Sequence, residues 1–491
     1  MFVSLYTTRL ILASLGASDF GIFNVVGGAI GMLGFLNSTL ANATQRFMSY
    51  AEGQGQLDKK RQIFNVSVIL HMFIAVVTVI ILIAAMFPFF NGIFNIEQDR
   101  IFAAKVVYIS LIFSTFLTII NVPYDAVMNA HENMLYYSIV GIFESLLRLA
   151  VAFVIIKTVL DKLVLYGVLM ACIPLITLTI MTIYCHRHYD ECVIAPRRYW
   201  DRGLVKQISG FFGWNFLTAV SSLFSAQGLG IVLNHFFGSV LNAAQGIANQ
   251  VNGVLSNFSV NMMKALNPVI TKSAGAGDVE TMNRATLVGC KFSTMLTMFF
   301  AIPLSLEMPY VLDLWLKEVP EWAVLFCVLQ LVQTVIIQMA NGAATAVYAQ
   351  GDIKHYAIYK SIVNAMPVFL TLLAFKLGGG PVWLYIPMIV VWAIGGDIVI
   401  LHYAKQKCGL KVVAYIRNVV IPLFGTAVLM LLCGSISFLL YKSCFGRIVF
   451  TFVATSIGML IAARLFAVTK DEKEKLLGFV NGLLKQKNTE I

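Results

Sequence analysis

The chain carries two copies of one pattern of small, apolar and acidic residues, and this repeat constrains the fold more than any other feature. A first set recurs after 222 positions without a gap: Gly31, Leu33, Gly53, Gly55 and Asp58 return as Gly253, Leu255, Gly275, Gly277 and Glu280, and Gly16 returns as Gly238. A second set recurs after 220 positions: Ala126, Val127, Glu132 and Tyr136 return as Ala346, Val347, Asp352 and Tyr356. Both copies lie in strongly apolar sequence. The repeat therefore predicts two similar membrane lobes around a central pathway.

Composition places the chain in a membrane. Of the 491 residues, 59% are hydrophobic and 12% are charged, about half the charged share of globular proteins. A helix crosses the ~30 Å hydrocarbon core with roughly 20 apolar residues. We expect an all-α integral membrane protein with about 14 transmembrane helices. The expected full spans are 21–45, 63–89, 104–128, 135–157, 163–185, 210–234, 240–265, 287–309, 323–348, 355–377, 382–403, 414–440 and 448–466. The first stretch, 1–15, is either a truncated helix or a short tilted one.

A basic stretch that is poor in helix signals separates the two copies. Six helices precede it, so the second copy starts in the same orientation as the first, and the lobes are parallel around an axis along the membrane normal. The predicted organisation is an N-terminal lobe (1–185), a cytoplasmic linker (186–207), a C-terminal lobe (208–403), helices 13 and 14 (404–466) and a tail (467–491). The tail is expected to be either an amphipathic helix on the membrane surface or a solvated helix end.

The formal net charge is +11, and the basic residues that cause it are distributed according to the membrane topology. With the N-terminus in the cytoplasm, the inside segments hold about 24 Lys and Arg residues and the outside segments about 8, as the positive-inside rule requires. The charge therefore predicts two cytoplasmic termini and no nucleic-acid partner.

Polar residues inside apolar spans are costly and are candidates for function. One stripe is repeated in the two copies at helical spacing, which places its members on one helix face. It comprises Thr39, Asn42, Gln45 and Arg46 in the first copy and Asn257, Asn261, Lys264 and Asn267 in the second. We interpret these stripes as the lining of a substrate cavity. The alternative is hydrogen bonding between helices without a ligand.

Charged residues within the spans suggest an anionic substrate. Arg9 has no acid nearby in the sequence, whereas Glu144 and Arg148 are four residues apart and can form an ion pair. Arg9 and Arg148, together with Arg46 and Lys264, predict a positively charged cavity that is suited to a phosphate group. The alternatives are a structural Glu144–Arg148 pair and snorkelling of Arg46 to the interface.

No catalytic pattern stands out in the sequence. His71 and His235 are isolated, and no nucleotide-binding loop, metalloprotease motif or nucleophile elbow is present. The eight cysteines form no CxxC pair, so no metal cluster is expected. We therefore predict no catalytic residue, metal or cofactor, and any transport would draw on ion gradients, the membrane potential or another step of a pathway.

Three segments resemble a known family. Residues 6–9, 15–23 and 42–47 are similar to the Wzx-type O-antigen and capsule flippases of the MOP (MATE-like) superfamily. The resemblance implies two MATE-like six-helix lobes, a cationic cavity and a groove at helices 13 and 14 for a lipid tail. It also implies an undecaprenyl-pyrophosphate-linked oligosaccharide as substrate, alternating access, a bacterial inner-membrane location, and contact with membrane lipids and other polysaccharide-assembly proteins.

Two other functions remain open at this stage. A MATE-type drug or cation antiporter would favour acids over bases in the cavity, and here bases dominate. A membrane glycosyltransferase or acyltransferase would need a catalytic acid or histidine, for which Asp19 is the candidate, but large loops outside the membrane are missing.

Overall fold

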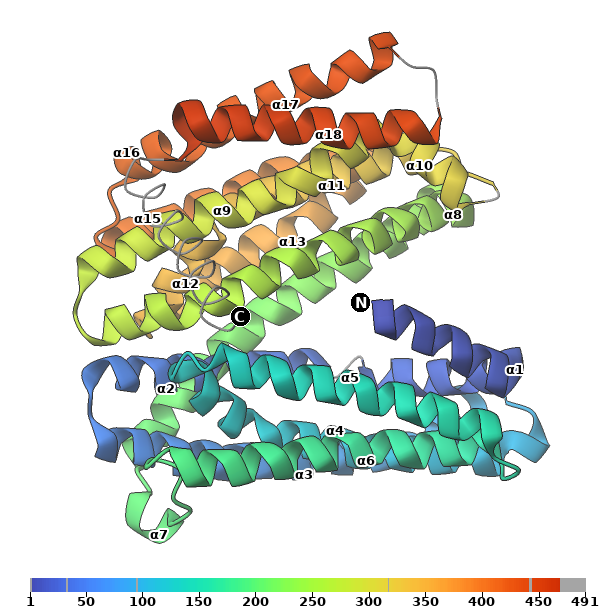
Figure 1. Cartoon of the computed structure of the whole chain (residues 1–491), viewed down its shortest axis with the longest axis vertical. Helices are drawn as coiled ribbons and strands as arrows, with labels where there is room; N and C mark the ends of the chain where they lie inside the picture. Colours follow the sequence, from blue (N-terminus) through green and yellow to red (C-terminus); the bar gives the residue numbers. More distant parts are fainter. Residues whose placement is uncertain (1, 32–33, 94–95, 317, 441–443, 469–491) are drawn as a thin grey trace, which may run out of the picture. The chain divides into compact units, whose positions relative to one another are not determined.

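The structure is a computed structural model that describes residues 2–31, 34–93, 96–316, 318–440 and 444–468, which form helices and loops without a β-strand (Figure 1). The predicted all-α class is confirmed. Within these ranges, ten helices are long and apolar enough to cross a membrane, or up to twelve if each of two bent pairs is one span. The predicted count of 14 is not confirmed. The expected spans 210–234 and 240–265 lie in one helical element, α8 (Arg202–Gly275), and the polar α2 (Gly34–Gln54) is not among the candidate spans.

The helices group into two compact units, which we describe separately. Unit 1 comprises Met1–Ala219 and Thr271–Asp278, and unit 2 comprises Val220–Ile270 and Val279–Ile491. The predicted lobe and linker boundaries remain predictions.

Unit 1 is built around one central helix. Its elements are α1 (Phe2–Gly31), α2, α3 (Leu57–Pro88), η1 (Phe89–Ile93), η2 (Gln98–Arg100), α4 (Ile101–Ala130), α5 (Met134–Lys157), α6 (Lys162–His188), α7 (Pro196–Tyr199) and the two ends of α8. Helix α4 packs against α2, α3 and α6, and α1 packs against α5 (Figure 1). Asp161 and Asp201 begin α6 and α8 because their carboxylates accept hydrogen bonds from the first free backbone N–H groups.

Unit 2 contains most of the second copy and the C-terminal helices. Its elements are the middle of α8, α9 (Val279–Leu306), α10 (Met308–Trp315), α11 (Ala323–Met339), α12 (Asn341–Ala349), α13 (Lys354–Lys376), η3 (Pro381–Leu384), α14 (Tyr385–Pro387), η4 (Met388–Gly395), α15 (Gly396–Cys408), α16 (Val412–Tyr415), η5 (Ile416–Val420), α17 (Ile421–Leu440), α18 (Phe445–Ala462) and η6 (Ala463–Ala467). Helices α17 and α18 pack against each other and against α9 (Figure 1). The predicted tail helix lies outside the described residues, apart from its first two.

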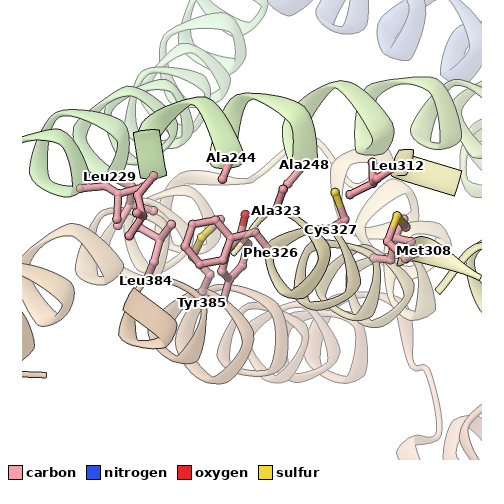
Figure 2. Close-up of a cluster of buried hydrophobic side chains, with 14 of the residues drawn as sticks. Leu229, Ala244, Ala248, Met308, Leu312, Ala323, Phe326, Cys327, Leu384 and Tyr385 are labelled. Atoms are coloured by element: carbon pink, nitrogen blue, oxygen red, sulfur yellow. The ribbon is translucent and has the colours of Figure 1, made fainter. Parts of the chain in front are cut away.

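The core of unit 2 joins α8 to α11 and to the segment before η4. Figure 2 shows Leu229, Ala244 and Ala248 facing the buried rings of Phe326 and Tyr385, whose centroids are 5.1 Å apart. Small residues on α8 leave room for these rings, so the helices approach closely at a tightly packed point.

The sequence repeat is also a repeat of backbone geometry. Gly16 (φ 80°, ψ 168°) interrupts α1, and Gly238 (φ 78°, ψ −170°) interrupts α8. Only glycine adopts this region readily. Gly55 (φ 66°) and Gly277 (φ 74°) then follow the ends of α2 and α8. Residues 222 positions apart therefore share both a type and a conformation.

A second glycine pair in unit 1 allows two helices to touch through their backbones. A Cβ atom at Gly53 would lie 1.9 Å from the carbonyl oxygen of Lys272, and one at Gly275 would lie 2.0 Å from that of Tyr50. Tyr50 and Lys272 are themselves 222 positions apart, so the two contacts are reciprocal. We call this contact between α2 and the end of α8 the glycine crossing. Beside it, Lys272 Nζ lies 3.3 Å from Glu132 Oε1.

Candidate functional site

Unit 1 holds a polar cavity of about 290 Å³ between α4, α5 and α6. It contains two carboxylates, Asp125 and Glu144, and one arginine, Arg148. We call it the carboxylate pocket. On α4 its lining residues follow the spacing i, i+4, i+7 and i+11 from Ser114 to Asp125, which places them on one helix face.

The polar groups of the carboxylate pocket are partly paired. Arg148 Nη2 donates to Glu144 Oε1 at 2.6 Å, which confirms the predicted i, i+4 pair. Asn121 Nδ2 donates to Asp125 Oδ1 at 3.1 Å. Asn121 Oδ1 is buried and accepts no hydrogen bond from the described residues. A buried acceptor without a donor is costly, so this oxygen is suited to a donor from a bound molecule or water.

Unit 2 holds a cavity of about 250 Å³ that is lined by amides. We call it the amide pocket. Its amides come from α8 and α11, and an indole ring from η4 completes the wall. These residues are Gln245, Asn249, Asn252, Gln330, Gln333, Gln338 and Trp392. Each amide carries both donors and an acceptor on a planar group.

One acceptor in the amide pocket is left open. Thr334 Oγ1 donates to Asn252 Oδ1 at 2.6 Å, and Gln330 Nε2 donates to Gln333 Oε1 at 3.2 Å. Gln330 Oε1 is buried, and no described residue donates to it. The internal bonds fix the orientation of the amides and leave this oxygen without a donor from the described residues.

The two pockets use equivalent positions of the repeat. Ser114 and Thr118 line the carboxylate pocket, and Thr334 and Gln338, each 220 positions later, line the amide pocket. This offset is the same as that of the second sequence block. Each copy therefore places a polar cavity on the corresponding helix, with carboxylates in one and amides in the other.

The predicted stripe in the first copy is only partly accessible. Thr39 is buried and its carbonyl oxygen accepts a bond from Asn215, whereas Asn42 is exposed and Gln45 is half-buried. The guanidinium of Arg46 lies 4.5 Å from the ring centre of Phe47, which is a cation–π contact. Arg9 lies in α1, and its side chain is outside what the structure describes.

The predicted stripe in the second copy is mostly exposed within unit 2. Asn257, Asn261 and Lys264 have exposed side chains on α8, and Asn267 accepts a hydrogen bond from Thr345 at 3.0 Å. None of these is among the residues that line the amide pocket. Asn249 and Asn252 of the same helix do line the amide pocket, because they lie on the face that packs against α11. The cavity-lining role of the exposed stripe remains a prediction.

The sequence reasoning missed most of the pocket residues. Asp125 and Asn121 come from α4, and their proximity to Glu144 depends on helix packing. A signal was present for the amide pocket, since Gln330, Gln333 and Gln338 interrupt an apolar span. Each such interruption marks a residue that needs a polar partner.

A separate group of charged residues lies near the glycine crossing in unit 1. Glu52, His131 and Glu191 offer potential metal-ligand atoms that all lie within 4.8 Å of one another. The ammonium of Lys60 lies 2.6 Å from Glu52 and 3.8 Å from Glu191, and His131 Nε2 donates to Glu191 at 2.5 Å. A lysine thus already supplies the positive charge, so we interpret these four residues as an ion network.

Acid is expected to weaken this ion network. Burial raises the pKa of Glu191, but the hydrogen bond from His131 and the charges of His131 and Lys60 outweigh burial and lower the pKa below its ordinary value of 4.5. The ionised carboxylate thus stabilises the fold above pH 4.5, and this stability is lost as the pH falls through the lowered pKa. We expect the melting temperature of purified Glu191→Gln to be lower than wild type near neutral pH and to converge with it in acid. Exposed Glu97→Gln is the control, and a difference that does not change with pH would contradict the linkage.

Comparisons with known proteins agree on the fold. The MatE family model matches residues 1–154, and no curated protein matches the chain by sequence. A crystal structure of a MATE mutant has a TM-score of 0.70 at 15% identity and covers 83% of this chain and 94% of that one.

Two further structures carry descriptive names. An outward-facing multidrug resistance MATE family transporter of the MOP superfamily has a TM-score of 0.65 at 15% identity, covering 83% of this chain and 90% of that one. A MOP superfamily transporter from Pyrococcus furiosus, described as having a binding pocket of reverse polarity that suggests a different function, has a TM-score of 0.64 at 15% identity, covering 84% and 94%. The chain therefore has the multi-pass, all-helical fold of the MATE transporters of the MOP superfamily, and its first 154 residues match the MatE family model.

Proposed function

We propose that the chain is a membrane transporter that flips an undecaprenyl-pyrophosphate-linked oligosaccharide across the bacterial inner membrane by alternating access. The observation that carries this proposal is the amide pocket, with its open acceptor at Gln330 Oε1. Sugar hydroxyls are donors and acceptors without charge, and amides meet both needs. The indole of Trp392 adds an apolar face with a polar edge.

The anionic end of such a substrate needs a cation. Arg148 is neutralised by Glu144, and Arg46 lies over aromatic rings. Arg148 and Lys264 are both exposed on their helices, but Arg148 is held in an ion pair with Glu144, and no ion pair is found for Lys264 among the described residues. We therefore assign the pyrophosphate to Lys264 in this proposal, rather than to Arg148.

Loss of the open acceptor is expected to reduce transport of the glycan. Gln330→Met keeps the length of the side chain and removes its hydrogen-bonding groups, and one such bond contributes about 0.5–1.5 kcal/mol. We expect surface polysaccharide to fall by about two- to tenfold at unchanged protein level, measured in the native host after deletion of the chromosomal copy. Gln406→Met, at an exposed position of α15, is the matched control. Full polysaccharide display by Gln330→Met would contradict the proposal.

A MATE-type cation antiporter is the second candidate, and the carboxylate pocket favours it. Asp125 and Glu144 outnumber Arg148 there, which suits a cationic substrate or a coupling ion. Asp125→Asn separates the two functions. In an antiporter it abolishes efflux of cationic drugs from a hypersensitive strain while leaving polysaccharide unchanged. In the proposed flippase, which binds its substrate through the amide pocket and Lys264, the variant has no drug phenotype because the wild type exports no drug.

An enzyme function has less support. Asp19, the candidate acid, is held by Arg100, whose Nε lies 2.9 Å from Asp19 Oδ1 and whose Nη1 lies 2.8 Å from Asp161. Both carboxylate oxygens of Asp19 accept hydrogen bonds from Arg100, so this acid is engaged in a structural ion pair.

A further inference from the structure

A third cavity, of about 700 Å³, lies in unit 2 where α9 meets the segment that joins α15 to α16. Of the described residues that line it, three are cations (Arg284, Lys291 and Lys411), one is an acid (Glu280) and two are amides (Asn283 and Asn418). We call it the basic pocket. Its net charge of about +2 sets it apart from the carboxylate and amide pockets.

The fold holds the cations of the basic pocket in place. Arg284 and Lys291 lie on one face of α9, seven residues apart. Gly409 (φ 65°) ends α15 in the left-handed conformation, and Asn283 Nδ2 donates to Cys408 O at 3.1 Å. This bond ties the turn to α9 and brings Lys411 to the same cavity. The pocket is therefore formed by defined backbone geometry.

The three cations of the basic pocket differ in solvent exposure, and we call the exposed side of the pocket its mouth. Arg284 and Lys411 are exposed, whereas Lys291 is only 2% exposed. An anion in the cavity would lie beside the ammonium of Lys291, which is one of the lining residues. Cations at the mouth can guide the same anion inward.

The surface beside the basic pocket is apolar. Val413 and Phe424 are 78% and 72% exposed, and Ile416 and Ile421 are also exposed. They lie on α16, η5 and α17, directly after Lys411 in the chain. A ligand with a charged head and hydrocarbon chains would match both surfaces, whereas a free anion would use only the first.

We propose that the basic pocket binds the phosphate headgroup of an anionic phospholipid whose chains lie along α16 to α17. Basic pockets between helices on the cytoplasmic side are typical sites for such headgroups, and the count of Lys and Arg predicts that this end of α9 is cytoplasmic. The residues that line the basic pocket are different from those that line the amide pocket. Arginine binds phosphate through two parallel hydrogen bonds, and lysine binds it as a point charge.

Thermal unfolding of the full chain in detergent tests the proposal. We expect added phosphatidylglycerol to raise the melting temperature more than phosphatidylcholine does. The double variant Arg284→Gln/Lys411→Gln changes only exposed residues and spares the buried Lys291, so we expect it to fold. Its affinity for phosphatidylglycerol should fall about tenfold or more, because two charge-assisted bonds are lost. Lys405→Gln, at an exposed position of α15, should bind as the wild type does.

Native mass spectrometry provides a second readout, since the number of phosphatidylglycerol molecules retained should fall in the double variant. Three results would overturn the proposal. They are equal stabilisation by the two lipids, an unchanged lipid affinity in the double variant, and an equal effect of free inorganic pyrophosphate, which would assign the pocket to a soluble anion.

Discussion

Glu307→Ala is expected to lower the free energy of unfolding by about 3–5 kcal/mol, because it leaves a buried arginine without its partner. Glu307 is 1% exposed and follows α9 directly. Arg447 of α18 donates to it from Nε at 3.0 Å and from Nη2 at 2.8 Å, and Thr451 Oγ1 donates at 2.8 Å. The pair thus fixes α18 to the end of α9.

The measurement is thermal or chemical unfolding of the purified protein in detergent. Glu318→Ala, an exposed acid a short distance along the chain, should change stability by less than about 0.5 kcal/mol. The double variant Glu307→Leu/Arg447→Met removes both charges and should recover most of the loss, since apolar residues often replace a buried pair without penalty. Similar melting temperatures for Glu307→Ala and Glu318→Ala would show that the pair does not contribute.

Substitution at the glycine crossing is expected to have the next largest effect. An alanine Cβ at Gly53 would lie 1.9 Å from the carbonyl oxygen of Lys272, so α2 and the end of α8 must move apart. Forcing extra atoms into a packed contact costs about 1–3 kcal/mol and sometimes more. Here the obstacle is backbone, which cannot rotate away. We expect Gly53→Ala and Gly275→Ala to melt at lower temperatures and to lose the proposed polysaccharide export.

A helical glycine with free space separates this steric effect from a change in helix propensity. A Cβ at Gly210 would meet no atom within 4 Å, and alanine favours helices over glycine by about 1 kcal/mol. Gly210→Ala should therefore be neutral or stabilising. If all three variants behave alike, the close approach at the crossing does not limit stability.

The sequence predicted the repeat in more detail than it predicted the pockets. Gly16 and Gly238 could be paired from their spacing. Both positions adopt a conformation that requires glycine, so the shared conformation appears in the sequence as a repeated glycine. The Glu144–Arg148 pair was also predictable, since both residues lie on one helix. Contacts along a single helix depend on spacing alone.

Contacts between distant helices could not be predicted in this way. Glu307 and Arg447 are 140 positions apart. The sequence around either residue does not indicate that the other is its partner. Asn249 and Asn252 line the amide pocket, whereas Asn257 and Asn261 of the same helix are exposed. The sequence shows that this helix carries several amides, but only packing against α11 decides which face forms a cavity.

The glycine crossing has the symmetry of a homodimer. In an isologous interface each residue meets its partner twice, once from either side of a two-fold axis. Gly53 against Lys272 and Gly275 against Tyr50 follow that rule within one chain. A half-length ancestor with one such glycine would have paired with itself, and fusion of two copies would have freed the interface from its dependence on concentration. The facing residues have since diverged to tyrosine and lysine, because the contact uses only their backbone carbonyls and leaves their side chains free to change.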